Sequence, residues 1–257
     1  MTAQVMPLIQ PEGHDLPSAR CSASDVLRWS GQRALACRET DEIMFSMRRV
    51  AAGDALLHAG QPFEHVYCVG AGSFKSVQID VEGYEQVLGF AIHGDMLGLD
   101  GLYKSRHASD ALALEDAAVA VMPFRELVAL GHRVPALEQL LQRAAGAELM
   151  HRSELHYLMS ASSSEVRVAR FLMHFAQRQS AMGHSGRRLR LCMTRRDIAS
   201  CLGVAHETVS RALTALAQGG IIEVSHRDVE IVDAAALHDL QSTTRGRHGH
   251  HGDTLAA

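Results

Sequence analysis

The chain has 257 residues, of which 47% are hydrophobic and 21% are charged. A chain of this length and composition can form two globular domains with buried cores, which excludes a disordered protein. The formal net charge is −4, so any contact with a nucleic acid must come from a local basic patch rather than from the whole surface.

Residues 1–49 are expected to form an N-terminal arm followed by a short helix around Glu39 to Met47. The first residues lack the basic and apolar regions of a signal peptide. No apolar run in the chain approaches the roughly 20 residues that span a bilayer. We therefore expect a cytoplasmic protein that makes no membrane contact.

Residues 50–134 change to short apolar runs that are separated by glycines. The runs occupy residues 54–57, 65–69, 74–79, 86–92 and 110–122, and Pro123 closes the last of them. Short strands at roughly 8–12-residue spacing, with turn signals between them, predict a β-sandwich or small barrel rather than βαβ units. We expect a β-roll-like module, which the family resemblance described below implies to be the sensory domain.

Apolar residues in 135–160 keep a helical period over roughly twenty residues or more, which predicts a helix of about 30 Å or more. One interpretation is a helix that packs lengthwise on its own domain. A two-helix parallel seam between subunits is favoured by the spacing. The predicted seam residues are Leu137, Leu141, Ala144, Leu149 and Leu155.

Residues 161–240 predict a winged helix-turn-helix. An amphipathic helix over 165–179 and a short strand over 189–193 come first, and a hairpin over 222–232 comes last. Between them, Thr194 and Asp197 have the spacing of a capping box, and Gly203 follows the first short helix where the chain must turn.

The second helix of this motif begins near Ala205 and has two different faces. Apolar residues recur at three and four positions on the inward face (Val209, Ala212, Leu213 and Leu216), and polar residues occupy the outward face (His206, Glu207, Ser210, Arg211 and Thr214). In the major groove, arginine binds guanine O6 and N7, and glutamate accepts from cytosine N4. The alternative is an ordinary surface helix with a Glu207–Arg211 ion pair that contributes only a few tenths of a kcal/mol.

Arginines are in excess between Arg178 and Arg211, which gives the motif a local basic patch. We expect Thr194 and Arg195, at the start of the first helix, to join the recognition face as DNA contacts.

The order of β-roll, long helix and winged helix-turn-helix resembles the CRP/FNR family of dimeric transcription regulators over about residues 50–232. The segment 206–211 is similar to the E-x-x-S-R recognition helix of the FNR branch, and the segments 163–172 and 94–100 also resemble that branch. The resemblance implies an α+β fold with a cyclic-nucleotide-binding-like β-roll. It also implies a homodimer that reads a palindrome of TTGA-type half-sites through Glu207, Ser210 and Arg211, while His206 departs from the family pattern.

By the same resemblance, the loop that carries Glu82, Gly83 and Tyr84 would contact RNA polymerase in an activator, although a plain hairpin turn explains the loop equally well. The sequence does not choose between activation and repression.

The sensory residues of the family are mostly missing. Oxygen-sensing relatives hold a [4Fe–4S] cluster with four cysteines, whereas this chain has Cys21 in the matching arm and Ala120 at the fourth position. The Arg-Ser pair that binds the phosphate of cyclic AMP is replaced by His107-Ala108. Both ligands are therefore disfavoured, and the effector is unknown.

Other sensory chemistry stays open. Cys21 and Cys37 could form a thiol switch or help to hold haem or a metal, whereas Cys68 is expected to be an inert buried residue. Residues 241–257 form a His-rich tail that we expect to be flexible, and no closed zinc spacing is present. A regulator without any ligand is a further alternative.

Enzyme motifs such as a P-loop, G-x-S-x-G or H-E-x-x-H do not occur in the sequence, so we expect no enzyme. The competing class is a protein-interaction or ligand-binding module whose helix-turn-helix no longer functions.

Overall fold

The computed structural model describes residues 19–161, 163–183 and 185–242 of the chain, so parts of the predicted arm and the His-rich tail lie outside the described residues. The first described segment forms β1 (Arg20–Ser22), α1 (Ala23–Trp29), the 3-10 helix η1 (Arg33–Leu35) and α2 (Arg38–Glu42). The helix predicted around Glu39 to Met47 is wrong in its second half. Met44–Val50 instead forms strand β2, because it pairs with β1 on one side and with β9 on the other.

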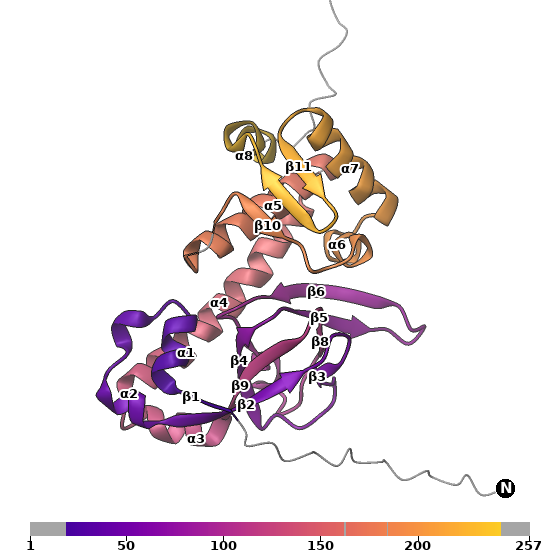
Figure 1. Ribbon diagram of the computed structural model, residues 1–257. Helices are drawn as coiled ribbons and strands as arrows, with labels where there is room; N and C mark the ends of the chain where they lie inside the picture. Colours follow the sequence, from indigo (N-terminus) through magenta and orange to yellow (C-terminus); the bar gives the residue numbers. More distant parts are fainter. Residues whose placement is uncertain (1–18, 162, 184, 243–257) are drawn as a thin grey trace, which may run out of the picture.

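Two antiparallel sheets form the β-roll (Figure 1), with strand orders β1-β2-β9-β4-β7 and β3-β8-β5-β6. The strands follow the predicted apolar runs, and a short strand and a 3-10 helix are added between 96 and 101. Their bounds are β3 (Ala55–Leu57), β4 (His65–Ala71), β5 (Phe74–Ile79), β6 (Glu85–Ala91), β7 (Met96–Leu97), η2 (Leu99–Gly101), β8 (Asp110–Ala113) and β9 (Ala117–Pro123).

The turn between β6 and β7 requires a glycine. Gly94 has φ +86°, and a Cβ atom at this position would lie 2.1 Å from the carbonyl oxygen of Trp29. The missing side chain therefore lets the end of α1 approach the roll closely.

Three helices follow the roll: α3 (Phe124–Gly131), α4 (Pro135–Met159) and α5 (Ser164–Ala181). Pro135 stands in the first turn of α4, where its missing N–H leaves no intrahelical bond unmade. The 25 residues of α4 span about 37 Å at 1.5 Å per residue. Its first half buries Leu137 and Leu140 in a core that also contains Leu27 of α1 and Leu127 of α3.

The C-terminal domain contains β10 (Arg188–Arg190), α6 (Arg195–Leu202), α7 (His206–Gln218), β11 (Ile222–Ser225), β12 (Asp228–Ile231) and α8 (Ala234–Ser242). The strands pair in the order β10-β12-β11, so the predicted hairpin is a wing that carries the preceding short strand on its edge. The α+β fold class is therefore the predicted one. Within the described ranges, no helix has the length and hydropathy needed to cross a bilayer.

Candidate nucleic-acid interface

Local contacts place α7 by fixing the helix that precedes it. The Thr194 hydroxyl accepts from the backbone N–H of Asp197 at 3.1 Å, and the Asp197 carboxylate accepts from the backbone N–H of Thr194 at 2.8 Å. These reciprocal bonds form the predicted capping box of α6. Gly203 ends α6 with φ +63°, the left-handed conformation that favours glycine.

Arg167 of α5 fixes the turn between the two helices. Its Nη1 donates to the carbonyl oxygens of Leu202 at 3.1 Å and of Gly203 at 3.4 Å, and its Nε donates to Ala161 at 2.8 Å. The last carbonyls of a helix lack intrahelical partners, so a guanidinium group there both satisfies them and holds the turn. The role of Arg167 was not predicted from the sequence, because the two turn carbonyls that it binds are 35 and 36 residues away in the chain.

The two faces of α7 are as the sequence predicts. Val209, Ala212, Leu213 and Leu216 are buried, whereas His206, Glu207, Ser210, Arg211 and Thr214 are exposed. The Glu207 carboxylate lies 3.2 Å from His206 Nε2, and Arg211 donates to the Thr208 hydroxyl at 3.4 Å. The Ser210 hydroxyl donates to the carbonyl of His206 at 3.3 Å, which leaves its lone pairs free to accept. The exposed face thus presents a carboxylate, a hydroxyl and a guanidinium group side by side.

Thr194 and Arg195 stand at the start of α6, the helix that precedes this face. Thr194 is exposed, whereas Arg195 is half-buried, and its burial lowers the pKa of the guanidinium group. The prediction that Arg195 contacts DNA assumes a fully exposed side chain, whereas part of this side chain is buried.

The structure divides the five predicted seam residues of α4 between two faces. Leu137 and Ala144 are buried in the core of their own chain, and Leu141 and Leu155 pack against the same chain. Leu149 alone is on the outward face, where 69% of its surface is exposed. The five-residue step from Ala144 to Leu149 turns the helix by about 500°, which places the two residues about 140° apart. The outward face carries Gly146, Leu149, Met150, Ser153 and Tyr157.

The predicted polymerase-contact loop is the turn that joins β5 to β6. The Asp80 carboxylate accepts from the backbone N–H groups of Glu82 at 2.9 Å and Tyr84 at 2.8 Å, and Gly83 has φ +82°. Tyr84 and Val81 point into solvent from this turn, and Tyr84 is 58% exposed. The hydrogen bonds to Asp80 thus hold the backbone of the turn from which Val81 and Tyr84 project.

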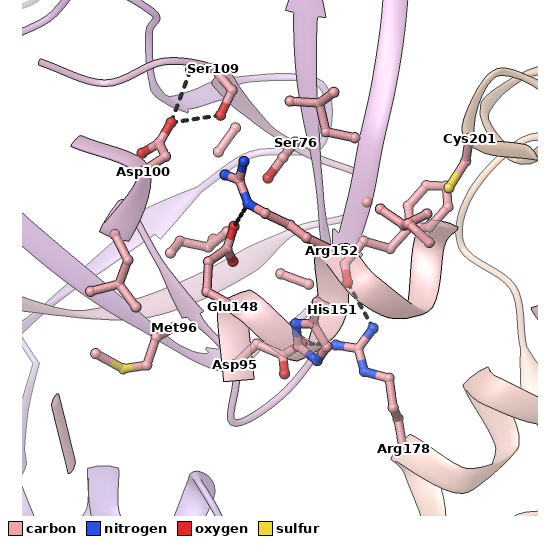
Figure 2. Close-up of a pocket in the computed structure, with 18 of the residues that line it drawn as sticks. Ser76, Asp95, Met96, Asp100, Ser109, Glu148, His151, Arg152, Arg178 and Cys201 are labelled. Carbon is pink, nitrogen blue, oxygen red and sulfur yellow. Dashed lines mark hydrogen bonds and ion pairs between the residues drawn. The ribbon is translucent and has the colours of Figure 1, made fainter. Parts of the chain in front are cut away.

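A cavity of about 340 Å³ lies where the roll meets α4 and α5. Figure 2 shows Glu148, His151 and Arg152 of α4 near Ser76, Met96 and Asp100 of the roll. Arg152 Nε donates to Glu148 at 3.1 Å.

The loop that matches the family's phosphate-binding segment is tied to Asp100 of the roll. The Asp100 carboxylate accepts from the backbone N–H of Ala108 at 2.9 Å and from the Ser109 hydroxyl at 2.8 Å, and His107 Nδ1 lies 3.1 Å away. The polar groups of this loop therefore bind the Asp100 carboxylate rather than facing a ligand. Ala108 has no hydroxyl that could donate to a phosphate.

His174 of α5 also lines the cavity, and its side chain is 18% exposed. Burial, with the nearby Arg178 and His151, lowers its pKa from 6.5 to about 4, although Glu154 lies 3.4 Å from its ring. The unfolded chain therefore binds the proton more tightly, and the stability that neutral His174 contributes is complete above pH 6.5 and lost as the pH falls toward 4.

We expect the free energy of unfolding in urea to fall between pH 7 and pH 5 by roughly 2 kcal/mol more in the wild type than in His174→Gln. The exposed His132, changed to glutamine, is the matched control. The same pH dependence in the wild type and in His174→Gln would contradict the assignment.

The cysteines do not fit a [4Fe–4S] cluster. Cys21, Cys68 and Ala120 are buried together in one apolar cluster, and burial raises the pKa of Cys21 to about 11 and that of Cys68 still further. Cluster ligands must be thiolates, which burial of this kind opposes. Cys68 is fully buried, as the sequence predicts. In the described part of the chain, no group of three or more His, Cys, Asp or Glu side chains could hold a metal ion.

Known proteins resemble both halves of the chain. The family model of the cyclic nucleotide-binding domain matches residues 47–133, and that of the Crp-like helix-turn-helix domain matches residues 166–240. The transcriptional regulatory protein btr of Bordetella pertussis is 34% identical over 82% of this chain and 87% of its own length. The transcriptional activator protein anr of Pseudomonas aeruginosa is 34% identical over 77% of this chain and 81% of its own length.

Among solved structures, FixK2 from Bradyrhizobium japonicum is similar with a TM-score of 0.70 and 26% identity, over 77% of this chain and 98% of that chain. The relatives are named as regulators and not as enzymes. The two domain matches, the extent of these identities and the exposed recognition helix lead to one conclusion: the chain belongs to the CRP/FNR family of DNA-binding transcription regulators.

Proposed function

We propose that the protein acts as a homodimer that reads a palindromic operator of TTGA-type half-sites. The observation that carries this proposal is the exposed face of α7, where Glu207, Ser210 and Arg211 stand on its N-terminal half. A TTGA half-site contains one G·C pair. Its guanine offers O6 and N7 to Arg211, and its cytosine amino group can donate to Glu207.

The remaining contacts follow from the position of α7. Thr194 at the start of α6 would bind a backbone phosphate, and Arg195 would reach a second one if its half-buried side chain extends. His206 precedes Glu207 and would face the outer base of the half-site.

Homodimer formation is supported by the outward face of α4. Leu149, Met150 and Tyr157 are exposed there by 69%, 59% and 50%, and Gly146 leaves room for the backbone of a second helix. Such a contiguous apolar face on a long helix is typical of a subunit interface. Two heads related by a twofold axis would meet two half-sites about one helical turn apart.

Activation of transcription is the regulatory role that we propose, since the relative from Pseudomonas aeruginosa is named a transcriptional activator. The β5–β6 turn, with Glu82, Gly83 and the exposed Tyr84, offers a surface for RNA polymerase. This role places the protein in the cytoplasm.

A gel shift of the full chain on a TTGA palindrome and on a scrambled duplex, each at two salt concentrations, tests the proposal. We expect at least about a thousandfold preference for the palindrome. Affinity for both duplexes should fall steeply with salt, because phosphate contacts release counterions. Equal binding to the two duplexes would instead support a module whose helix-turn-helix no longer reads DNA.

A further inference from the structure

The first helix of the helix-turn-helix docks on an edge strand of the β-roll. Figure 1 shows α6 beside β6, which is the last strand of its sheet. Ser200 of α6 is at the centre of this contact: its hydroxyl accepts from the backbone N–H of Val87 at 2.9 Å and donates to the carbonyl of Glu85 at 3.1 Å. Gln86 Nε2 donates to the backbone carbonyl of Ser200 at 2.6 Å. The DNA-binding domain thus provides hydrogen-bond partners for backbone N–H and C=O groups that the edge strand β6 would otherwise expose.

An ion-paired cluster adds a second attachment. Lys75 of β5 binds the Asp197 carboxylate at 2.9 Å and also pairs with Glu85. The side chains of Lys75 and Asp197 are only 16% and 10% exposed, so water screens this pair little. Asp197 is also the residue that caps α6 through Thr194. The Asp197 carboxylate therefore caps the N-terminus of α6 and also binds this helix to the roll through Lys75.

Apolar packing continues across the same boundary. Val77, Val87 and Phe90 of the roll belong to the hydrophobic cluster that forms the core of the DNA-binding domain. The ring of Phe90 meets that of Phe171 edge to face with centroids 6.0 Å apart, and Arg178 of α5 donates to the carbonyl of Phe90 at 2.9 Å. The DNA-binding domain therefore packs directly against the roll, in addition to its covalent connection through α4 and α5.

From these contacts we infer that Lys75 and Ser200 are positioning residues, which hold the recognition helix at one orientation and so set the half-site spacing that the dimer accepts. Neither residue is on the exposed face of α7. A DNA-binding domain whose orientation is fixed before binding loses little rotational entropy when it binds DNA. A DNA-binding domain that moves freely on the roll loses more rotational entropy, which weakens binding. A fixed pair of heads also matches a single spacing. This inference rests on the proposed reading of a palindrome by a homodimer.

The test uses Lys75→Met and Ser200→Ala in the full chain. Lys75→Met leaves Glu85 and Asp197 facing each other without a cation, and Ser200→Ala removes two bonds across the boundary without a change of charge. Fluorescence anisotropy measures affinity for palindromes whose half-site spacing differs by single base pairs, and for a duplex with one half-site.

For the wild type we expect affinity to fall on the order of tenfold or more when the best spacing changes by one base pair, and for both variants only about twofold. Binding to the single half-site should stay unchanged in the variants, because the reading face itself is intact. Lys75→Arg, which keeps the charge, should keep the wild-type preference. So should Arg38→Met, which breaks an exposed ion pair of α2 with Glu42.

A sharp spacing preference in Lys75→Met and Ser200→Ala would overturn the inference. Loss of single half-site binding in them would overturn it too, because the contacts would then serve the folding of the head. If the wild type does not prefer TTGA over a scrambled sequence, the proposed function fails first, before any variant is compared.

Discussion

Replacement of Arg211 by alanine is expected to remove most of the protein's discrimination at the guanine of its half-site. Arg211 is exposed on α7, and its long 3.4 Å bond to the Thr208 hydroxyl leaves the guanidinium group able to turn toward guanine O6 and N7. A bidentate contact of this kind contributes about 1–3 kcal/mol of discrimination, or roughly 5- to 150-fold in the affinity ratio. Competition between TTGA and TTAA palindromes measures this ratio.

Arg188→Ala is the matched control, because it removes the same charge from an exposed arginine of β10 that pairs with Glu230. This variant should weaken binding to both palindromes equally or leave it unchanged. An Arg211→Ala protein with the wild-type TTGA to TTAA ratio would show that another residue reads the guanine.

Leu149→Glu is expected to convert the proposed homodimer into monomers and to abolish operator binding at concentrations where the wild type is fully bound. Leu149 is 69% exposed in one chain, and in the proposed homodimer the partner would bury it. Each buried leucine contributes about 1.5–3 kcal/mol, and the twofold axis doubles this loss to roughly 3–6 kcal/mol. Two carboxylates brought together in the seam add to the loss. Sedimentation velocity gives the subunit state, and anisotropy gives the operator affinity.

Tyr103→Glu is the control for an exposed aromatic residue changed to an acid, since Tyr103 is 91% exposed and follows η2 in the roll rather than belonging to α4. It should remain dimeric. A dimeric Leu149→Glu protein with unchanged operator affinity would move the interface to another surface.

The helix-turn-helix of α6 and α7 could be predicted from the sequence because the signals that define it are local. The capping box joins residues three apart, Gly203 marks its own turn, and the apolar period of α7 repeats every three to four residues. Each signal lies within about one helical turn, so no distant partner is needed to interpret it. The strands of the roll were predicted for a similar reason, since glycines separate short apolar runs.

The first segment could not be predicted in the same way. Met44–Val50 is a strand because β1 and β9 pair with it, and the β9 partners of Ser46 and Met47 are Val121 and Ala120, more than seventy residues away. Local propensity cannot report a partner at that distance.

The residues alone were enough to predict the family, the α+β architecture and the exposed polar face of α7. The packing of the folded chain was needed to show which face of α4 stays exposed, and to show that Lys75 and Ser200 bind α6 to the roll. The physical reason is the same in both cases: burial and ion pairing depend on which surfaces meet. A helical period defines a stripe, but it does not say what covers that stripe.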